Sequence, residues 1–221
     1  LVMEIVHSSD DSLESVSDPE YFLDQLYDER FANSENGFEE EESGIESLYN
    51  FSLTDMIKHP LQHTWVLWYL TNDRKINWQD RLKEVAAFNT VEDFWALYNY
   101  IQKASSLPNN SDFYYFKQGV RPMWEDPRNK NGGRWIIRID RSEEGRVLDE
   151  CWLDLVMAVL GEQFSGLGAE ICGVAVSVRS KGHKVCLWTA NADSDENREI
   201  GYMMHSLLDS ANYVRFERHL E

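Results

Sequence analysis

The chain has 221 residues, which is enough for one domain with a sizeable core or for one domain and a tail. Its net charge of −18 argues at first sight against a nucleic-acid partner, but residues 1–50 contain 15 acidic residues and one basic residue, whereas the other 171 contain 24 acidic and 20 basic residues. The acidity therefore belongs to the N-terminal segment, and the remainder, with a net charge of −4, can still present a local basic patch to phosphates.

The cysteine pattern and the hydropathy indicate a reducing compartment. Cys151, Cys172 and Cys186 have no Cys-x-x-Cys spacing and no even-numbered disulfide framework, which is typical of buried free thiols. No apolar run approaches membrane-spanning length, and the opening LVMEIVHSSDDS is too short and too acidic for a signal peptide. We therefore expect a cytoplasmic or nuclear protein with no membrane partner.

Residues 1–55 are predicted to be an acidic, mostly disordered tail. Stretches such as SSDDSLESVSDPE and FEEEESGIES contain too few apolar residues to offset the entropy lost on ordering. One island, YFLDQLY at residues 21–27, interrupts them with aromatic and aliphatic side chains. The folded domain is expected to cover residues 56–221.

The first elements of that domain are predicted from periodicity and capping. HPLQHTWVLWYL predicts a strand with apolar residues on both faces, and the polar turn TNDRKINW follows it. FNTVEDFWALYNYIQKA predicts a helix, with Thr90 as its N-cap, Asp93 in the capping-box position and one apolar stripe at helical spacing.

The second half of the domain alternates short strands with helices. Strands are predicted at FYYFKQG, at GRWIIRID after the Gly132–Gly133 turn, and at YVRFERHL. LDECWLDLVMAVLGEQF and SDENREIGYMMHSLLDSA predict amphipathic helices, the latter with Ser194 as N-cap, and ICGVAVSVRSKGHKVCLWTA predicts a β-hairpin with a basic turn. This order favours an α+β domain, in which one antiparallel sheet carries three helices on one face and leaves the other face free for a ligand.

Three of the eight tryptophans stand in polar, turn-like settings: Trp78 in INWQD, Trp124 in PMWED and Trp188 at the end of VCLWTA. The alternative for each is a structural role in the core, which is the commoner one for this residue. If Trp78 and Trp124 face each other, they can hold a flat, positively charged ring, because the negative face of an indole attracts a cation. Glu125 can then accept hydrogen bonds from N–H donors on the edge of that ring.

The predicted hairpin turn adds positive charge. Arg179, Lys181 and Lys184 can neutralise phosphates attached to the stacked ring. Together with the tryptophans and the acid, they describe a pocket for a cationic purine that carries a phosphate chain.

Six stretches resemble the eukaryotic translation initiation factor 4E family, whose members bind the cap of messenger RNA: HPLQHTWVLWYL, TVEDFWALYNYI, RPMWEDPRNKNGGRW, WLDLVMAVLGEQF, ICGVAVSVRSKGHKV and LWTA. The resemblance covers residues 56–218 in order. It implies a curved antiparallel sheet with three helices on its convex face and the cap pocket on its concave face. A tyrosine stands at the first stacking position in the family's translational-repressor branch, so Trp78 favours the initiation-type branch.

The resemblance also implies roles for the pocket residues. Two indoles sandwich 7-methylguanine, an acid accepts its N1 and N2 hydrogens, a third indole contacts the methyl group, and basic residues hold the phosphates. Trp78 and Trp124 are the implied stacking indoles, Glu125 is the acid and Trp188 is the third indole. The basic residues are Arg179 and Lys184 beside Lys181, with Arg134 as water-mediated support.

Members of this family bind partner proteins on the helical back of the domain. The resemblance implies a partner surface at His59, Pro60, Val91, Trp95, Leu153, Asp154 and Met157. Helical periodicity alone places Trp95 in the core, and only the resemblance moves it to the surface. The implied partners are the scaffold subunit 4G and the 4E-binding repressor proteins, which insert a Tyr-x4-Leu-Φ helix, where Φ is apolar, into this groove.

YFLDQLY matches that partner pattern through Tyr21, Leu26 and Tyr27, although Tyr27 departs from the usual Leu, Met or Phe at Φ. Two interpretations stay open: a chance match or helix fragment in a tail, or a partner motif carried by the chain itself, natural or fused. A flexible linker from Tyr27 to His59 spans on the order of 30 Å, so the motif can reach the back of its own domain. Family members also continue past the last strand with a basic loop, whereas this sequence ends at RFERHLE, so the contribution of that loop stays open.

No local motif indicates an enzyme. The sequence has no P-loop and no G-x-G-x-x-G run, and its histidines have no metal-ligand spacing with cysteine. We expect a monomeric cap-binding protein with no cofactor, no metal and no DNA partner, which recruits messenger RNA through a 4G-type partner in the cytoplasm, the nucleus or RNA granules. The alternative is a repressor or scaffold of the same fold that binds caps weakly, its back occupied by its own N-terminal motif.

Overall fold

The computed structural model describes residues 58–73, 75–140, 145–208 and 214–219. The predicted tail and its motif residues Tyr21, Leu26 and Tyr27 lie outside the described residues. No helix in the described ranges has both the length and the apolar composition needed to cross a membrane.

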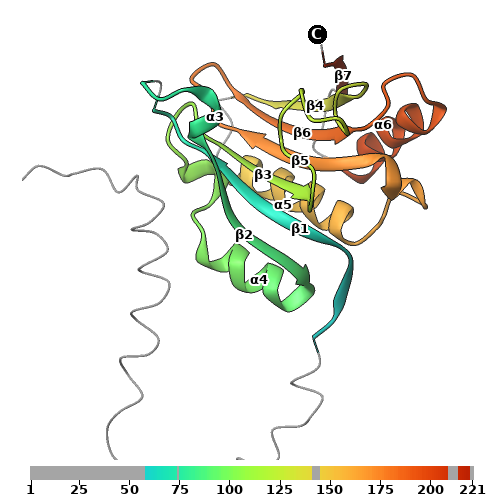
Figure 1. Cartoon of the computed structure of the whole chain (residues 1–221), viewed down its shortest axis with the longest axis horizontal. Coiled ribbons are helices and arrows are strands. Elements are labelled where there is room, and N and C mark those ends of the chain that lie inside the picture. Colours follow the sequence, from blue (N-terminus) through green and yellow to red (C-terminus); the bar gives the residue numbers. More distant parts are fainter. Residues whose placement is uncertain (1–57, 74, 141–144, 209–213, 220–221) are drawn as a thin grey trace, which may run out of the picture. The chain divides into compact units, whose positions relative to one another are not determined.

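Within the described residues, seven strands form one curved sheet in the order β2-β1-β3-β5-β6-β4-β7 (Figure 1). Every neighbouring pair is antiparallel. The strands are β1 (Pro60–Leu70), β2 (Leu82–Thr90), β3 (Asp112–Lys117), β4 (Gly133–Ile139), β5 (Ile171–Ser177), β6 (His183–Thr189) and β7 (Val214–Arg218).

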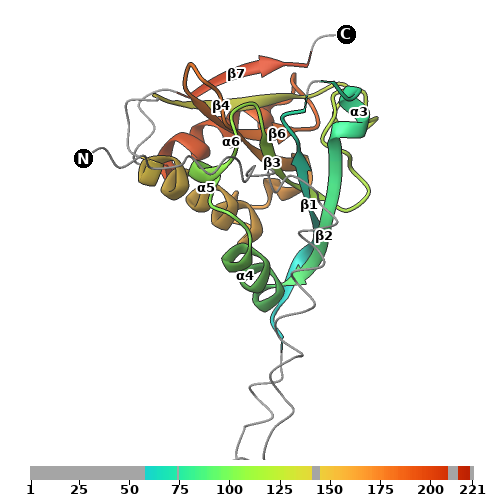
Figure 2. The same ribbon diagram turned by 90° about the vertical axis from the view of Figure 1, so that its left-hand side faces the viewer.

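Three long helices cover one side of this sheet, as Figure 2 shows: α4 (Val91–Tyr100), α5 (Gly145–Leu160) and α6 (Asp195–Leu207). The prediction of an α+β domain with one antiparallel sheet and three helices is confirmed. The described ranges also contain a one-turn helix, α3 (Trp78–Arg81), and two short 3-10 turns at Ala104–Ser106 and Leu167–Glu170, which the sequence did not predict.

The capping residues act as predicted at two helix starts. The Thr90 hydroxyl accepts a hydrogen bond from the Asp93 backbone N–H at 3.2 Å and donates to the Asp93 carboxylate at 2.7 Å. The Ser194 hydroxyl accepts from the Asn197 backbone N–H at 3.1 Å. Each bond satisfies one of the backbone donors that a helix start leaves free.

Strand alternation separates the two faces of the sheet. Tyr115 in β3 stacks on Trp152 of α5, with ring centroids 5.6 Å apart and planes at 11°, and meets Phe94 of α4 at 5.9 Å. Tyr115 therefore marks the helix-covered face. Its neighbours Tyr114 and Phe116 belong to the opposite face, where they join an apolar cluster that also contains residues of β1, β4, β5 and β6.

One strand, β2, was missed by the sequence analysis. It pairs with β1 at the edge of the sheet, and only Leu82 and Phe88 of its nine residues are buried. Its middle, KEVAA, has one residue of high strand propensity, Val85, between two exposed charged residues and two alanines. An edge strand of this kind is formed by pairing with its neighbour and has no apolar alternation of its own.

Candidate functional site

A hollow of about 640 Å³ opens on the sheet face opposite the long helices. Leu70, Tyr114 and Trp188 contribute its floor from three strands, and the loop between β3 and β4 contributes one rim. The complete lining is Leu70, Asn77, Gln79, Asp112, Tyr114, Pro122, Met123, Trp124, Glu125, Arg134, Arg179 and Trp188.

Five of the eight predicted cap-binding residues line this hollow. They are Trp124, Glu125, Arg134, Arg179 and Trp188. A sixth, Trp78, is the first residue of α3, and the residues immediately before and after it line the hollow. The chain therefore brings residues of two loops, two strands and α3 to the place where the sequence predicted one pocket.

The two remaining predicted residues, Lys181 and Lys184, are not in contact with the hollow. Lys184 is nonetheless on the same face of the sheet, because the strand register runs from Asp112 to Ser177 and from Ser177 to Lys184. Two strand spacings separate Lys184 from Asp112, roughly 10 Å. Lys181 is exposed in the turn between β5 and β6.

The loop that carries Trp124 is held from inside by two side chains. The buried Asn129 amide donates to the backbone carbonyls of Arg121 and Met123, both at 2.8 Å. The Asp126 carboxylate accepts from the backbone N–H of Arg121 at 2.9 Å. These hydrogen bonds hold the loop in place although it contains no apolar run. Trp124 on this loop is 42% exposed.

Trp188 has a different setting from the one the sequence suggested. It lies within β6, not in a turn, and only 7% of it is exposed. Its ring packs 5.4 Å from Phe116 and 4.2 Å from His219, centroid to centroid. Trp188 therefore lines the hollow while its ring packs against the imidazole of His219.

His219 is perturbed by this packing. Burial, and then the neighbouring positive charge of Arg134, lower the pKa of His219 to about 4. Arg134 in turn donates to the Glu217 carboxylate at 3.0 Å, and they form an ion pair. A neutral imidazole therefore backs Trp188 at neutral pH.

Acidification is expected to destabilise the folded domain through His219. The folded imidazole takes up a proton near pH 4 and an unfolded one near its ordinary value of 6.5, so folding stability is complete above pH 6.5 and is lost as the pH falls toward 4. Between pH 7 and pH 5 the loss from this group is on the order of 1 kcal/mol, because the imidazole is partly exposed and solvent screens part of the effect. Urea unfolding at both pH values should show this loss shrinking in His219→Phe; an unchanged difference would contradict the assignment.

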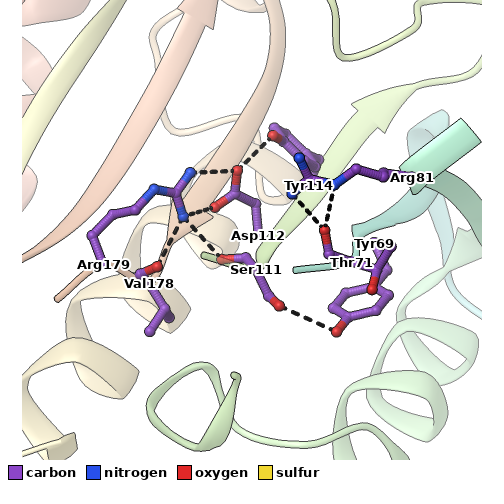
Figure 3. Close-up of polar contacts among 8 residues, drawn as sticks. All are labelled: Tyr69, Thr71, Arg81, Ser111, Asp112, Tyr114, Val178 and Arg179. Carbon is purple, nitrogen blue, oxygen red and sulfur yellow. Dashed lines mark hydrogen bonds and ion pairs between the residues drawn. The ribbon is translucent and has the colours of Figure 1, made fainter. Parts of the chain in front are cut away.

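The floor of the hollow contains a buried acid that the sequence analysis missed. Asp112 is 3% exposed, pairs with the Arg179 guanidinium, and accepts a hydrogen bond from the Tyr114 hydroxyl at 2.9 Å (Figure 3). The hydrogen bonds that Arg179 donates to Asp112 raise the pKa of Arg179. The available signal was one carboxylate at the start of the otherwise apolar run FYYF, which a strand pattern alone does not interpret.

The predicted partner residues lie at the surface of the helical side. His59, Pro60, Val91 and Asp154 are exposed, while Trp95, Leu153 and Met157 are partly buried. His59 and Val91 are joined because the Val91 N–H donates to the His59 carbonyl at 2.9 Å.

Trp95 is partly buried, which is intermediate between the core position that periodicity predicts and the surface position that the resemblance implies. The core position in that turn of α4 is taken by Phe94, which is 1% exposed, and Trp95 packs on it with centroids 5.1 Å apart. Tyr98, one turn further along, lies near α5, since burial and then the charges of Asp149 and Asp154 raise its pKa. The surface of α4 thus continues onto α5.

A second hollow, of about 580 Å³, lies on the other side of the Trp124 loop and contains none of the predicted residues. Two of its cations are already engaged: Arg218 pairs with Asp193, and Arg128 donates to the Ala169 carbonyl. In the described part of the chain, no group of three or more His, Cys, Asp or Glu side chains is placed to hold a metal ion.

Comparison with known proteins places this chain among translation initiation factors. The family model of eukaryotic initiation factor 4E matches residues 60–221. Eukaryotic translation initiation factor 4E-3 of Caenorhabditis elegans is 48% identical over 170 residues, which are 74% of this chain and 68% of that protein. The chain belongs to the eukaryotic initiation factor 4E family.

Solved structures of similar proteins share the fold. Ascaris suum eIF4E-3 with an m2,2,7G cap superposes with a TM-score of 0.72 at 49% identity, covering 74% of this chain and 93% of that chain, and the same protein has been solved with an m7G cap. C. elegans eIF4E-3 in complex with the 4E-binding protein Mextli superposes with a TM-score of 0.71 at 48% identity, covering 74% and 94%. The family resemblance and the expected fold are confirmed.

Proposed function

We propose that this protein binds the 7-methylguanosine cap of messenger RNA and brings the message to the translation machinery through a 4G-type partner. The observation that carries the proposal is an exposed indole beside an exposed carboxylate: Trp124 and Glu125 follow each other on the rim of the hollow. These are the two groups that a cationic purine with N–H donors on its edge needs. The caps in the similar Ascaris suum structures support the same reading.

In this proposal Trp78 and Trp124 stack on the two faces of the methylated guanine. Methylation at N7 makes the ring positive, and each desolvated contact between a cation and an indole contributes roughly 0.5 to 2 kcal/mol. Glu125 accepts the N1 and N2 hydrogens, and Trp188 forms the wall toward the methyl group. The position of α3 supports the role of Trp78, since the residues on either side of it line the hollow.

The phosphates extend toward the end of the sheet where β5 turns into β6. Arg179 is the cation that lines the hollow at this end, and Lys184 lies beyond it on the same face. Lys181 in the turn adds charge further out, and Arg134 acts through water from the opposite end of β4. Cations in this arrangement stabilise a triphosphate through charge-assisted hydrogen bonds and through the local field.

The helical side takes a partner helix. His59, Pro60, Val91, Trp95, Leu153, Asp154 and Met157 form this partner surface, which combines exposed polar groups with partly buried apolar ones. An amphipathic Tyr-x4-Leu-Φ helix fits such a surface. The complex of the C. elegans relative with a 4E-binding protein supports the proposal.

The proposed protein is a binding factor and not an enzyme, and it acts as a monomer of the initiation-type branch in the cytoplasm, with nuclear and RNA-granule pools as a further expectation. Its domain boundary near residue 56, with an acidic tail before it, belongs to the same proposal. Stacking, edge recognition and charge neutralisation together hold a ligand without breaking a bond.

Fluorescence titration tests the proposal. The wild-type protein is expected to be quenched by 7-methyl-GTP at concentrations at least about 100-fold below those needed for GTP, since two cation–indole contacts are lost with the methyl group. Trp124→Ala should remove this preference. Arg128→Ala, on the same loop but facing the second hollow, is the matched control and should keep it.

One outcome separates this proposal from its alternative. If the wild-type protein is not quenched by 7-methyl-GTP but still binds a 4G-type peptide, the chain is a scaffold or repressor of the same fold. A 2,2,7-trimethylated analogue, which has no N2 hydrogens, measures how much of the affinity depends on Glu125.

A further inference from the structure

Asp112 is a buried acid that faces the proposed ligand from the floor of the hollow. It opens β3, and both of its carboxylate oxygens are occupied: Arg179 donates to each of them, through Nη1 to Oδ1 and through Nη2 to Oδ2 at 2.9 Å, and the Tyr114 hydroxyl donates to Oδ2. Figure 3 shows the guanidinium and the carboxylate facing each other in this way. A charge this deeply buried is stable only when it is paired and hydrogen-bonded.

Arg179 is held by the backbone as well as by this acid. Its Nη1 donates to the Ser111 carbonyl at 3.2 Å and to the Val178 carbonyl at 2.9 Å. The two carbonyls hold the guanidinium independently of Asp112, so Arg179 should keep its place when that acid changes.

The Arg179–Asp112 pair has no net charge. A phosphate that approaches is attracted by the guanidinium and repelled by the carboxylate behind it. The pair can therefore donate hydrogen bonds from its N–H groups but exerts little net electrostatic attraction on the phosphate. Without the acid, the same guanidinium would attract any nucleoside triphosphate, whether or not its base is methylated.

We propose that Asp112 limits the contribution of the phosphates to binding in this hollow, so that most of the affinity for a nucleotide comes from its base. The inference rests on the proposed cap-binding function and extends it to a residue that contacts neither the base nor its methyl group. Lys184 is on the same face and two strands away from Asp112, so its positive charge lies at a distance from this pair.

Asp112→Asn tests this role because it removes the charge and keeps the shape. Affinity for 7-methyl-GTP and for GTP should both rise by roughly three- to tenfold, which is what one extra positive charge about 7 Å away supplies under partial screening. Affinity for the 7-methylguanosine nucleoside should not change, and the salt dependence of triphosphate binding should become steeper. Weaker or unaltered triphosphate binding, or an equal change for the nucleoside, overturns the inference.

Two further variants keep the test decisive. Glu199→Gln changes the net charge by the same amount from an exposed position on α6, on the far side of the sheet, and should leave all three affinities as they are. If Asp112→Asn does not fold, Asp112→Ser removes the same charge with a smaller side chain and leaves Arg179 on its two backbone carbonyls. Triphosphate affinity should then rise as it does for Asp112→Asn, and unaltered or weaker triphosphate binding contradicts the inference.

Failure of the two proposals can be told apart in the same titrations. No binding of 7-methyl-GTP by the wild-type protein contradicts the proposed function itself. Normal binding by the wild type, together with Asp112→Asn values that match it, contradicts only the role of Asp112.

Discussion

Replacing Glu125 with glutamine is expected to weaken binding of 7-methyl-GTP by about 100-fold, because hydrogen bonds to a charged acceptor are worth about 1.5–3 kcal/mol each and one of the two becomes a contact between two donors. The glutamine side chain has the same shape but presents one N–H group to a base edge that itself carries donors. Because Glu125 is exposed on the rim, the change should leave the folding stability almost unaltered. Isothermal titration of both proteins measures the ratio directly.

The inosine analogue of the ligand provides the control for Glu125. 7-Methyl-ITP lacks the N2 amino group, so the wild-type protein should bind it more weakly than 7-methyl-GTP, whereas Glu125→Gln should bind both about equally. If the wild type makes no distinction between the two analogues, the carboxylate does not recognise the base edge, and the arrangement beside Trp124 has another purpose.

Much of the fold was predictable because its strongest elements carry their own pattern. β1 and the β5–β6 hairpin are apolar on both faces, and α4 and α6 begin at caps that the side chains indeed form. β2 was missed because it is an edge strand whose middle has no alternation. Trp188 was placed in a turn because it precedes the polar residues that follow β6, although its burial belongs to the strand.

The site residues also differ in how far the sequence predicts them. Trp124 and Glu125 are an exposed indole and an exposed carboxylate next to each other in a polar loop, where packing gives no reason for them, so the sequence alone points to them. A buried ion pair is different, since Asp112 and Arg179 are far apart in the chain and meet only because β3 pairs with β5. Such a pair follows from the sheet register, and a single sequence does not supply that register.

The second large effect is expected on the helical side. Trp95→Ala should weaken binding of a 4G-type Tyr-x4-Leu-Φ peptide by about 30-fold or more, since a partly buried tryptophan at the centre of an interface commonly contributes 2 kcal/mol or more. The cap affinity should stay the same, because Trp95 lies on α4, on the other side of the sheet from the hollow. Phe94, not Trp95, fills the core at this turn, so the domain should remain folded.

The matched control for Trp95 is Tyr202→Ala, which removes an aromatic side chain that is 76% exposed on α6. The peptide should bind this variant as it binds the wild type, and an equal loss in both variants would mean that the peptide responds to exposed aromatic surface in general. Repeating the titration on protein without residues 1–50 tests the tail motif at Tyr21, Leu26 and Tyr27. A motif that occupies the partner surface competes with the peptide, so its removal should tighten peptide binding, and identical affinities exclude self-occupation.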